Sequence, residues 1–195
     1  MTHQVTRFIP MSLLAFFVVC SMTIQSQTLK INSKLSSMTV AGTTNVHDFE
    51  SKVSQITGEL VVSGKQIQSL DVNIPVHGIK SKEQLMDTKT YETFNATKNP
   101  NITFHLTEAT GLSINDKDIQ VTISGNLTMN ATTRKISFKV SGKNTKSGVY
   151  NFKATVPLKM TDYKMSPPTA MMGMMKVGDG ITLKMDIILE GPQIN

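Results

Sequence analysis

Cysteine and aromatic residues are scarce in this sequence, and both shortages limit what the protein can be. Cys20 is the only cysteine among 195 residues, tryptophan is absent, and aromatic residues make up 6% of the chain. A disulfide framework within the chain is therefore excluded. A hydrophobic core must be filled by Ile, Leu, Val and Met, or remain partly unfilled.

The motifs of several enzyme classes are also absent. There is no glycine-rich phosphate-binding loop, no HExxH zinc motif and no GxSxG nucleophile motif. The formal net charge is +6, but Lys and Arg are scattered and do not form the clustered basic face typical of nucleic-acid-binding proteins. We therefore expect no enzyme, no cofactor and no nucleic-acid partner. A diffuse positive surface could instead favour anionic lipid head groups.

The longest apolar run lies at the N-terminus and is too short to span a bilayer. Arg7 precedes an apolar run at residues 8–20, whereas a membrane-spanning helix needs ~20 residues. A positive charge followed by a short apolar run is typical of a secretory signal peptide. We predict a signal peptide at residues 1–26 and one domain at residues 27–195. Cleavage there would remove Cys20, and with it any thiol nucleophile or thiolate metal ligand.

The remaining chain alternates apolar and polar residues in row after row. The apolar positions include Met38 and Val40; Leu60 and Val62; Leu70, Val72 and Ile74; Val121 and Ile123; Ile136 and Phe138; Phe152 and Val156; and Ile181, Leu183 and Met185. Strict alternation predicts strands with one dry face, which packs in the protein interior, and one face exposed to solvent. Turn signals such as Ser63-Gly64-Lys65 lie between the rows, so neighbouring strands should pair antiparallel.

We predict an all-β fold in which about eight antiparallel strands close into a barrel, because closure is the simplest way to cover their dry faces. A two-sheet sandwich would show the same alternation. An eight-stranded barrel is either just filled by side chains or holds one small ligand. The inward positions Gly42, Gly58, Gly125 and Ala154 are small, which favours a cavity, although glycines can also mark bulges or bends.

One short helix is predicted between the strands. Asp87 can act as its N-cap, Tyr91 and Phe94 share a face at i, i+3 spacing, and Asn95 can end it in the left-handed conformation. We predict a helix from about Thr88 to Asn95 that forms a plug or side wall for whatever the strands enclose. So short a helix is unstable alone, so its aromatic face must hold it in place.

Several longer patterns are more specific than the alternation. They are Met86-Asp87-x-Lys89-x-Tyr91-Glu92 with Lys98-x-Pro100-x-Ile102-x-Phe104, Gly125-x-Leu127-Thr128, Pro167-Pro168-x-Ala170-Met171 with Lys176-x-Gly178-Asp179, and His47-Asp48-Phe49. Together they resemble the YceI-like family of secreted, lipocalin-like proteins that bind polyisoprenoid lipids, with Phe49 where Trp is commoner. The resemblance spans about residues 29–189. It implies an eight-stranded lipocalin-like barrel with one short helix, in a periplasmic or secreted protein that carries or stores a long isoprenoid chain.

A lipid cavity of this kind needs only an apolar wall. Each buried methylene-sized group contributes ~0.8 kcal/mol, and an isoprenoid chain has no hydrogen-bonding groups. Given the implied fold, we predict lipid contacts from Phe49, Met86, Tyr91, Phe94, Phe104, Leu106, Phe138, Phe152, Met160, Met171 and Met174. Arg134 and Lys135 would meet a pyrophosphate head group if they reach the barrel mouth, and would otherwise be solvated turn charges.

Two other functions stay open. Residues 165–175, MSPPTAMMGMM, carry thioethers that can select Cu(I), so the protein could handle copper in the periplasm. Methionine is also an adaptable filler of greasy surfaces, which suits a loop that meets a lipid. The second alternative is a secreted stress protein with a filled barrel. His47, His77 and His105 match no local ligand spacing, so we predict no metal site. The sequence is compatible with transient membrane contact and with a homodimer.

Overall fold

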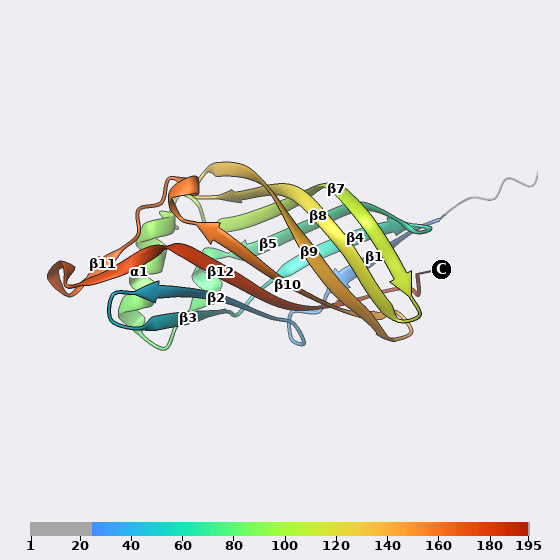
Figure 1. The fold of residues 1–195 in the computed structure, drawn as a ribbon, viewed down its shortest axis with the longest axis horizontal. Helices are drawn as coiled ribbons and strands as arrows, with labels where there is room; N and C mark the ends of the chain where they lie inside the picture. The colour runs from blue at the N-terminus through green and yellow to red at the C-terminus, as the bar shows by residue number, and fades with distance from the viewer. Residues whose placement is uncertain (1–24, 195) are drawn as a thin grey trace, which may run out of the picture.

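The fold is an antiparallel sheet that closes into a barrel (Figure 1). The computed structural model describes residues 25–194. The ring runs β1–β4–β5–β7–β8–β9–β10–β12 and closes because β1 pairs with both β4 and β12. Its strands are β1 (Ser26–Ile31), β4 (Thr57–Ser63), β5 (Gln66–Pro75), β7 (Asn101–Asn115), β8 (Asp118–Met129), β9 (Thr132–Lys146), β10 (Val149–Lys159) and β12 (Met175–Glu190). The predicted eight-stranded antiparallel barrel is confirmed, and a two-sheet sandwich is excluded.

The predicted signal peptide, residues 1–26, lies almost wholly outside the described residues. The first strand, β1, begins at its last residue, Ser26, which pairs with Ser63 of β4. The predicted domain at residues 27–195 therefore begins within β1.

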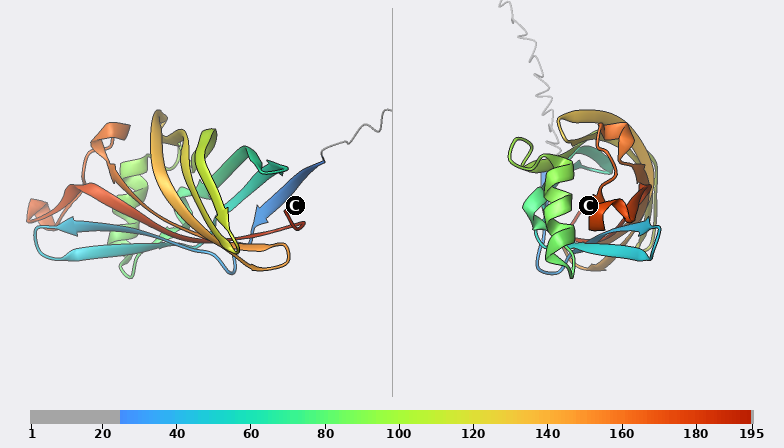
Figure 2. Two further views of the ribbon diagram at one scale, coloured as in Figure 1. Left: turned by 45° about the vertical axis from the view of Figure 1, so that its right-hand side comes forward. Right: turned by 90° about the vertical axis from the view of Figure 1, so that its left-hand side faces the viewer.

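Three further strands extend the barrel wall at one end. They are β2 (Ser37–Thr44), β3 (Asp48–Val53) and β6 (Ile79–Lys80), which we call the flap. The long strand β12 serves two partners, since residues 189 and 190 pair with β1 and residues 177–186 pair with β2. Figure 2 shows helix α1 (Gln84–Phe94) lying across the same end of the barrel.

Short elements join the longer ones at this end. The 3-10 turn η1 (Val76–Gly78) leads from β5 to β6. The segment from β10 to β12 contains η2 (Thr161–Tyr163), β11 (Thr169–Ala170) and η3 (Met171–Gly173). Within residues 25–194, no helix has the length and apolar character needed to cross a membrane.

The helix α1 starts earlier than the sequence predicted. Its N-cap is Glu83, and Asp87, the predicted cap, lies one turn inside. The Asp87 carboxylate instead accepts hydrogen bonds from the backbone N–H and the hydroxyl of Ser81, at 2.6 and 2.9 Å. Partial burial acts to raise the pKa of Asp87, but these bonds and the charge of Lys80 outweigh it and hold the pKa below its usual value. The predicted left-handed end is confirmed at Asn95, with φ 48°.

Phenylalanine rings cover two of the inward glycines. A Cβ atom added at Gly125 would lie 2.4 Å from Cζ of Phe104, and one at Gly42 would lie 2.6 Å from Cζ of Phe49. The expectation that small inward residues leave a cavity is therefore wrong at Gly42 and Gly125, because rings from the same sheet occupy that space. Ala154, in contrast, lines a cavity inside the barrel.

Candidate functional site

A cavity of about 180 Å³, which we call the first chamber, lies inside the barrel. All eight ring strands contribute apolar side chains to its wall, for example Ile31 of β1 and Val121 of β8. Successive side chains of a strand point to opposite faces, so the alternating rows place their apolar members inside. Lys65 and Lys153 are the charged residues of this wall, and Lys153 pairs with Asp186 at 3.2 Å.

A second cavity of about 90 Å³, the second chamber, lies between α1, the flap and the end of the barrel. The helix contributes Met86 and Phe94 to its wall, and β3 contributes Phe49 and Val53. The residues that line both chambers are Met38, Ile74, Leu127 and Leu183. The chambers therefore adjoin and form one apolar interior along the barrel.

Seven of the predicted lipid contacts line these chambers. Phe104, Phe138 and Phe152 line the first chamber, and Phe49, Met86, Phe94 and Met160 line the second. The rings of Phe104 and Phe138 lie 5.8 Å apart between centroids, in a tilted arrangement that aromatic pairs favour. The fold thus brings these seven residues onto one interior, and their contact with a lipid stays a prediction.

The other four predicted contacts line neither chamber; they are Tyr91, Leu106, Met171 and Met174. The Tyr91 ring lies 4.4 Å from the ring of His77, and its hydroxyl donates to the carbonyl oxygens of His77 and Ile79 at 3.3 Å. Residues three apart on a helix point about 60° apart. Phe94 therefore reaches the interior, while Tyr91 fastens α1 to η1 and β6.

Methionine forms much of the second chamber. The residues concerned are Met38, Met86, Met129, Met160 and Met165. The sequence suggested one methionine-rich loop at residues 165–175, but the structure buries its first methionine and exposes most of the others. Met165 is buried, whereas Met171, Met172 and Met174, which we call the methionine tip, are exposed. Met38 and Met129 could have been found from their alternating rows, whereas Met165 follows a turn and has no such signal.

Tyr163 is a buried residue that no sequence pattern singled out. Its side chain is 1% exposed, and burial raises the pKa of its phenol. The turn that carries it is held by Asp179, which accepts from the N–H and the hydroxyl of Thr161 at 2.9 and 2.7 Å. These two bonds lower the pKa of Asp179. Asn130 donates to the carbonyl oxygens of Tyr163 and Lys164, each at 3.3 Å.

Arg134 also holds this turn. Its Nε donates to the carbonyl oxygen of Asp162 at 2.8 Å, and neither Arg134 nor Lys135 lines a chamber. The arginine is thus engaged with the backbone of η2, and the expected contact with a pyrophosphate gains no support from its position.

The three histidines of the described residues lie in separate places. His47 is bonded through Nδ1 to the backbone oxygen of Asp48, His77 lies against Tyr91, and Nδ1 of His105 is 2.6 Å from a carboxylate oxygen of Asp71. Across residues 25–194, no three His, Cys, Asp or Glu side chains are grouped to hold a metal ion. The side chains that line the two chambers are mainly apolar, and Tyr163 lies in the buried cluster next to them.

Comparison with known proteins agrees with this architecture. A family model for the YceI-like domain matches residues 24–189. The chain belongs to the YceI-like family. No curated protein matches this YceI-like chain.

Solved structures show the same fold at low sequence identity. BcnA of Burkholderia cenocepacia is 14% identical with a TM-score of 0.67, covering 81% of this chain and 98% of its own. A polyisoprenoid-binding domain from Saccharophagus degradans, implicated in plant cell wall breakdown, is 10% identical with a TM-score of 0.67, covering 84% and 98%. The Campylobacter jejuni YceI protein is 17% identical with a TM-score of 0.59, covering 73% and 84%.

Proposed function

We propose that this YceI-like protein binds one long-chain apolar lipid of polyisoprenoid type inside its barrel, and carries or stores it in the periplasm or outside the cell. The main support is the pair of adjoining chambers, whose walls are almost entirely apolar. Each methylene-sized group buried against such a wall contributes ~0.8 kcal/mol. The Saccharophagus degradans domain of the same fold, described as polyisoprenoid-binding, supports this ligand class. The protein acts as a binding protein and not as an enzyme.

The size of the chambers sets a condition on binding. An apolar cavity of ~150 Å³ holds a benzene-sized molecule, so chambers of about 180 and 90 Å³ hold only a short stretch of isoprenoid chain. A longer chain has to displace side chains of the wall. Met38 and Leu183 lie in the wall that the chambers share, and an unbranched methionine adapts readily to a new neighbour. The ligand therefore joins the chambers by moving such residues.

The methionine tip supports contact with a membrane. Met171 and Met174 are 61% and 71% exposed, and Met172 is fully exposed. Asn45 ties the tip to the turn between β2 and β3, since Nδ2 donates to the backbone oxygen of Met174 at 2.9 Å. The tip lies at the end of the molecule that carries α1 (Figure 1). Removal of Arg7 with the signal peptide takes the formal charge from +6 to +5, so the protein stays positively charged. A positive net charge favours contact with anionic head groups at the membrane where the lipid is collected.

Native mass spectrometry of protein purified from its own host tests the proposal. The expected result is a mass increment equal to one lipid, which disappears after extraction with organic solvent. A copper increment that survives extraction and is removed by a Cu(I) chelator would favour copper handling, and a bare mass would favour a filled barrel. N-terminal sequencing of the same sample should give a start between Met22 and Thr28, whereas an intact Met1 would refute export.

A further inference from the structure

The hydroxyl of Tyr163 stands out from every other buried polar side-chain atom that the structure describes. Among residues 25–194, it is the one such atom without a hydrogen-bond partner. Buried hydroxyls are normally paired, because removing one from water without a partner is costly. An orphaned hydroxyl in an apolar interior therefore calls for a specific reason.

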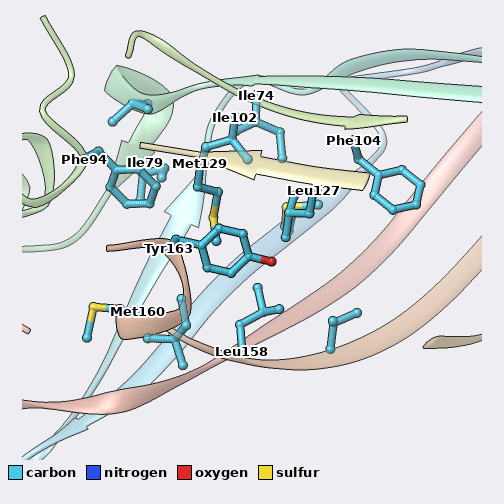
Figure 3. Packing of buried hydrophobic residues seen from close by; sticks show 14 of the residues in the cluster. Ile74, Ile79, Phe94, Ile102, Phe104, Leu127, Met129, Leu158, Met160 and Tyr163 are labelled. Atoms are coloured by element: carbon cyan, nitrogen blue, oxygen red, sulfur yellow. The ribbon is translucent and has the colours of Figure 1, made fainter. Parts of the chain in front are cut away.

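The backbone that carries the Tyr163 ring is held in place by hydrogen bonds. The backbone of η2 is bonded to Asp179 of β12 and to Arg134 of β9, and Asn130 holds the carbonyl oxygens of Tyr163 and Lys164. Figure 3 shows the phenol extending from η2 into the hydrophobic cluster, with its hydroxyl on the side of Leu127 and Leu158. The turn thus fixes an unpaired donor inside the barrel.

A second buried tyrosine shows that this chain can satisfy such a group. Tyr150 is also buried, and its hydroxyl accepts a hydrogen bond from the backbone N–H of Ile194 at 2.9 Å. The two residues lie on and just after the same strand, β10. The orphaned hydroxyl is therefore a local property of Tyr163.

The surroundings of Tyr163 connect it with the chambers. It belongs to the same buried cluster as Leu127, Met129 and Met160. Leu127 lines both chambers, and the two methionines line the second. Tyr163 itself lines neither chamber, so a side chain of this cluster has to move before the hydroxyl reaches the interior, and methionine is the side chain best suited to such movement.

We infer that Tyr163 donates a hydrogen bond to an acceptor oxygen of the bound ligand, so that the ligand is an apolar chain with a carbonyl or ether oxygen in its buried part. This rests on the proposed function. An uncharged oxygen fits better than an anion, because a buried anion needs a paired cation. Lys89, the one cation on the described wall of the second chamber, is already paired with Glu92 at 2.8 Å.

Matched tyrosine variants and matched probes test the inference. Delipidated wild type, Tyr163→Phe and Tyr150→Phe are titrated by calorimetry with farnesylacetone, an isoprenoid ketone, and with the hydrocarbon that has a methylene in place of its carbonyl. The ratio of ketone affinity to hydrocarbon affinity should be about two- to tenfold higher for wild type than for Tyr163→Phe, the range expected for one neutral hydrogen bond. Tyr163→Phe should keep its affinity for the hydrocarbon, whereas Tyr150→Phe should show the wild-type ratio.

Thermal unfolding without ligand provides an independent readout. Tyr163→Phe should unfold at the wild-type temperature or above it, because it removes an unpaired buried hydroxyl. Tyr150→Phe should unfold at a lower temperature, because it leaves the N–H of Ile194 without its acceptor.

Three results would overturn the inference. If both probes bind wild type and Tyr163→Phe with the same preference, Tyr163 is not the donor, and the proposed function stands. If ligand-free Tyr163→Phe is destabilised as much as Tyr150→Phe, the hydroxyl already has a partner, such as a buried water. If neither probe binds wild type, the proposed function fails and the inference fails with it.

Discussion

Phe94→Ala distinguishes a chamber wall from ordinary core. Phe94 is the one buried residue of α1, and it lines the second chamber. Truncating a buried Phe costs about 3–5 kcal/mol. We expect the lower end, about 3 kcal/mol, because part of the ring already faces a cavity. Since α1 is too short to be stable without its anchor, much of this loss should appear as local opening of the helix.

The effect of ligand separates the two roles of Phe94. Burying a whole Phe side chain is worth about 1.5–3 kcal/mol, so a ring with about half its surface against the ligand contributes roughly 1 kcal/mol, or about fivefold in Kd. Ligand at 100 times the wild-type Kd stabilises wild type by about 2.7 kcal/mol, and a variant with a fivefold larger Kd by about 1.8 kcal/mol. Phe94→Ala should therefore cost about 0.9 kcal/mol more with ligand than without it.

Denaturant titration of delipidated protein, followed by far-UV circular dichroism with and without farnesylacetone, measures both losses. Tyr91→Phe is the control, because it removes a hydroxyl that fastens the same helix outside the chambers. It should cost about 1 kcal/mol in both conditions. Equal losses for Phe94→Ala in the two conditions would show that Phe94 is core and not ligand wall.

Three further experiments test other parts of the structure. Gly125→Ala should lower the free energy of unfolding by about 1–3 kcal/mol, because its Cβ would lie 2.4 Å from Cζ of Phe104; Gly180→Ala, with no atom within 4 Å, should be near neutral in the same titration. Asp87 has a lowered pKa, so it stabilises the fold above the unfolded pKa of about 4 and ceases to do so as pH falls through the folded value. The stability difference between wild type and Asp87→Asn should therefore shrink as unfolding is measured from pH 7 down to pH 2. Replacing the methionine tip by serines should weaken binding to phosphatidylglycerol vesicles and leave the unfolding midpoint unchanged; vesicle binding as strong as wild type would remove the tip from the proposal.

The barrel could be predicted from the sequence because alternation is a local property. A row such as Leu70, Val72 and Ile74 shows which face of its strand is dry, whichever strands become its neighbours. The same reasoning correctly placed Phe104 and Phe152 on the interior. Closure of the ring was then the simplest way to bury every dry face, and β1 supplies it by pairing on both edges.

Predictions failed where a residue depends on partners distant in the sequence. Tyr91 and Phe94 share a helix face, but contacts with η1 and β6 hold the tyrosine away from the walls of both chambers. Gly42 and Gly125 looked like space, but rings from residues 49 and 104 fill it. Tyr163 enters the core because Asp179, on another strand, fixes the turn before it. No local pattern contains these long-range contacts.

The two chambers differ in how firmly their walls are held, and this decides where a large ligand can enter. The side wall of the first chamber consists of ring strands that each pair with two neighbours, so parting them breaks a ladder. The second is covered by α1, which buries only Phe94, and by β6, which pairs with β3 through two residues. Local opening costs least where few apolar contacts and few ladder bonds must be broken. A chain too large for the chambers should therefore enter by displacing α1, at the same end of the barrel at which the methionine tip is exposed.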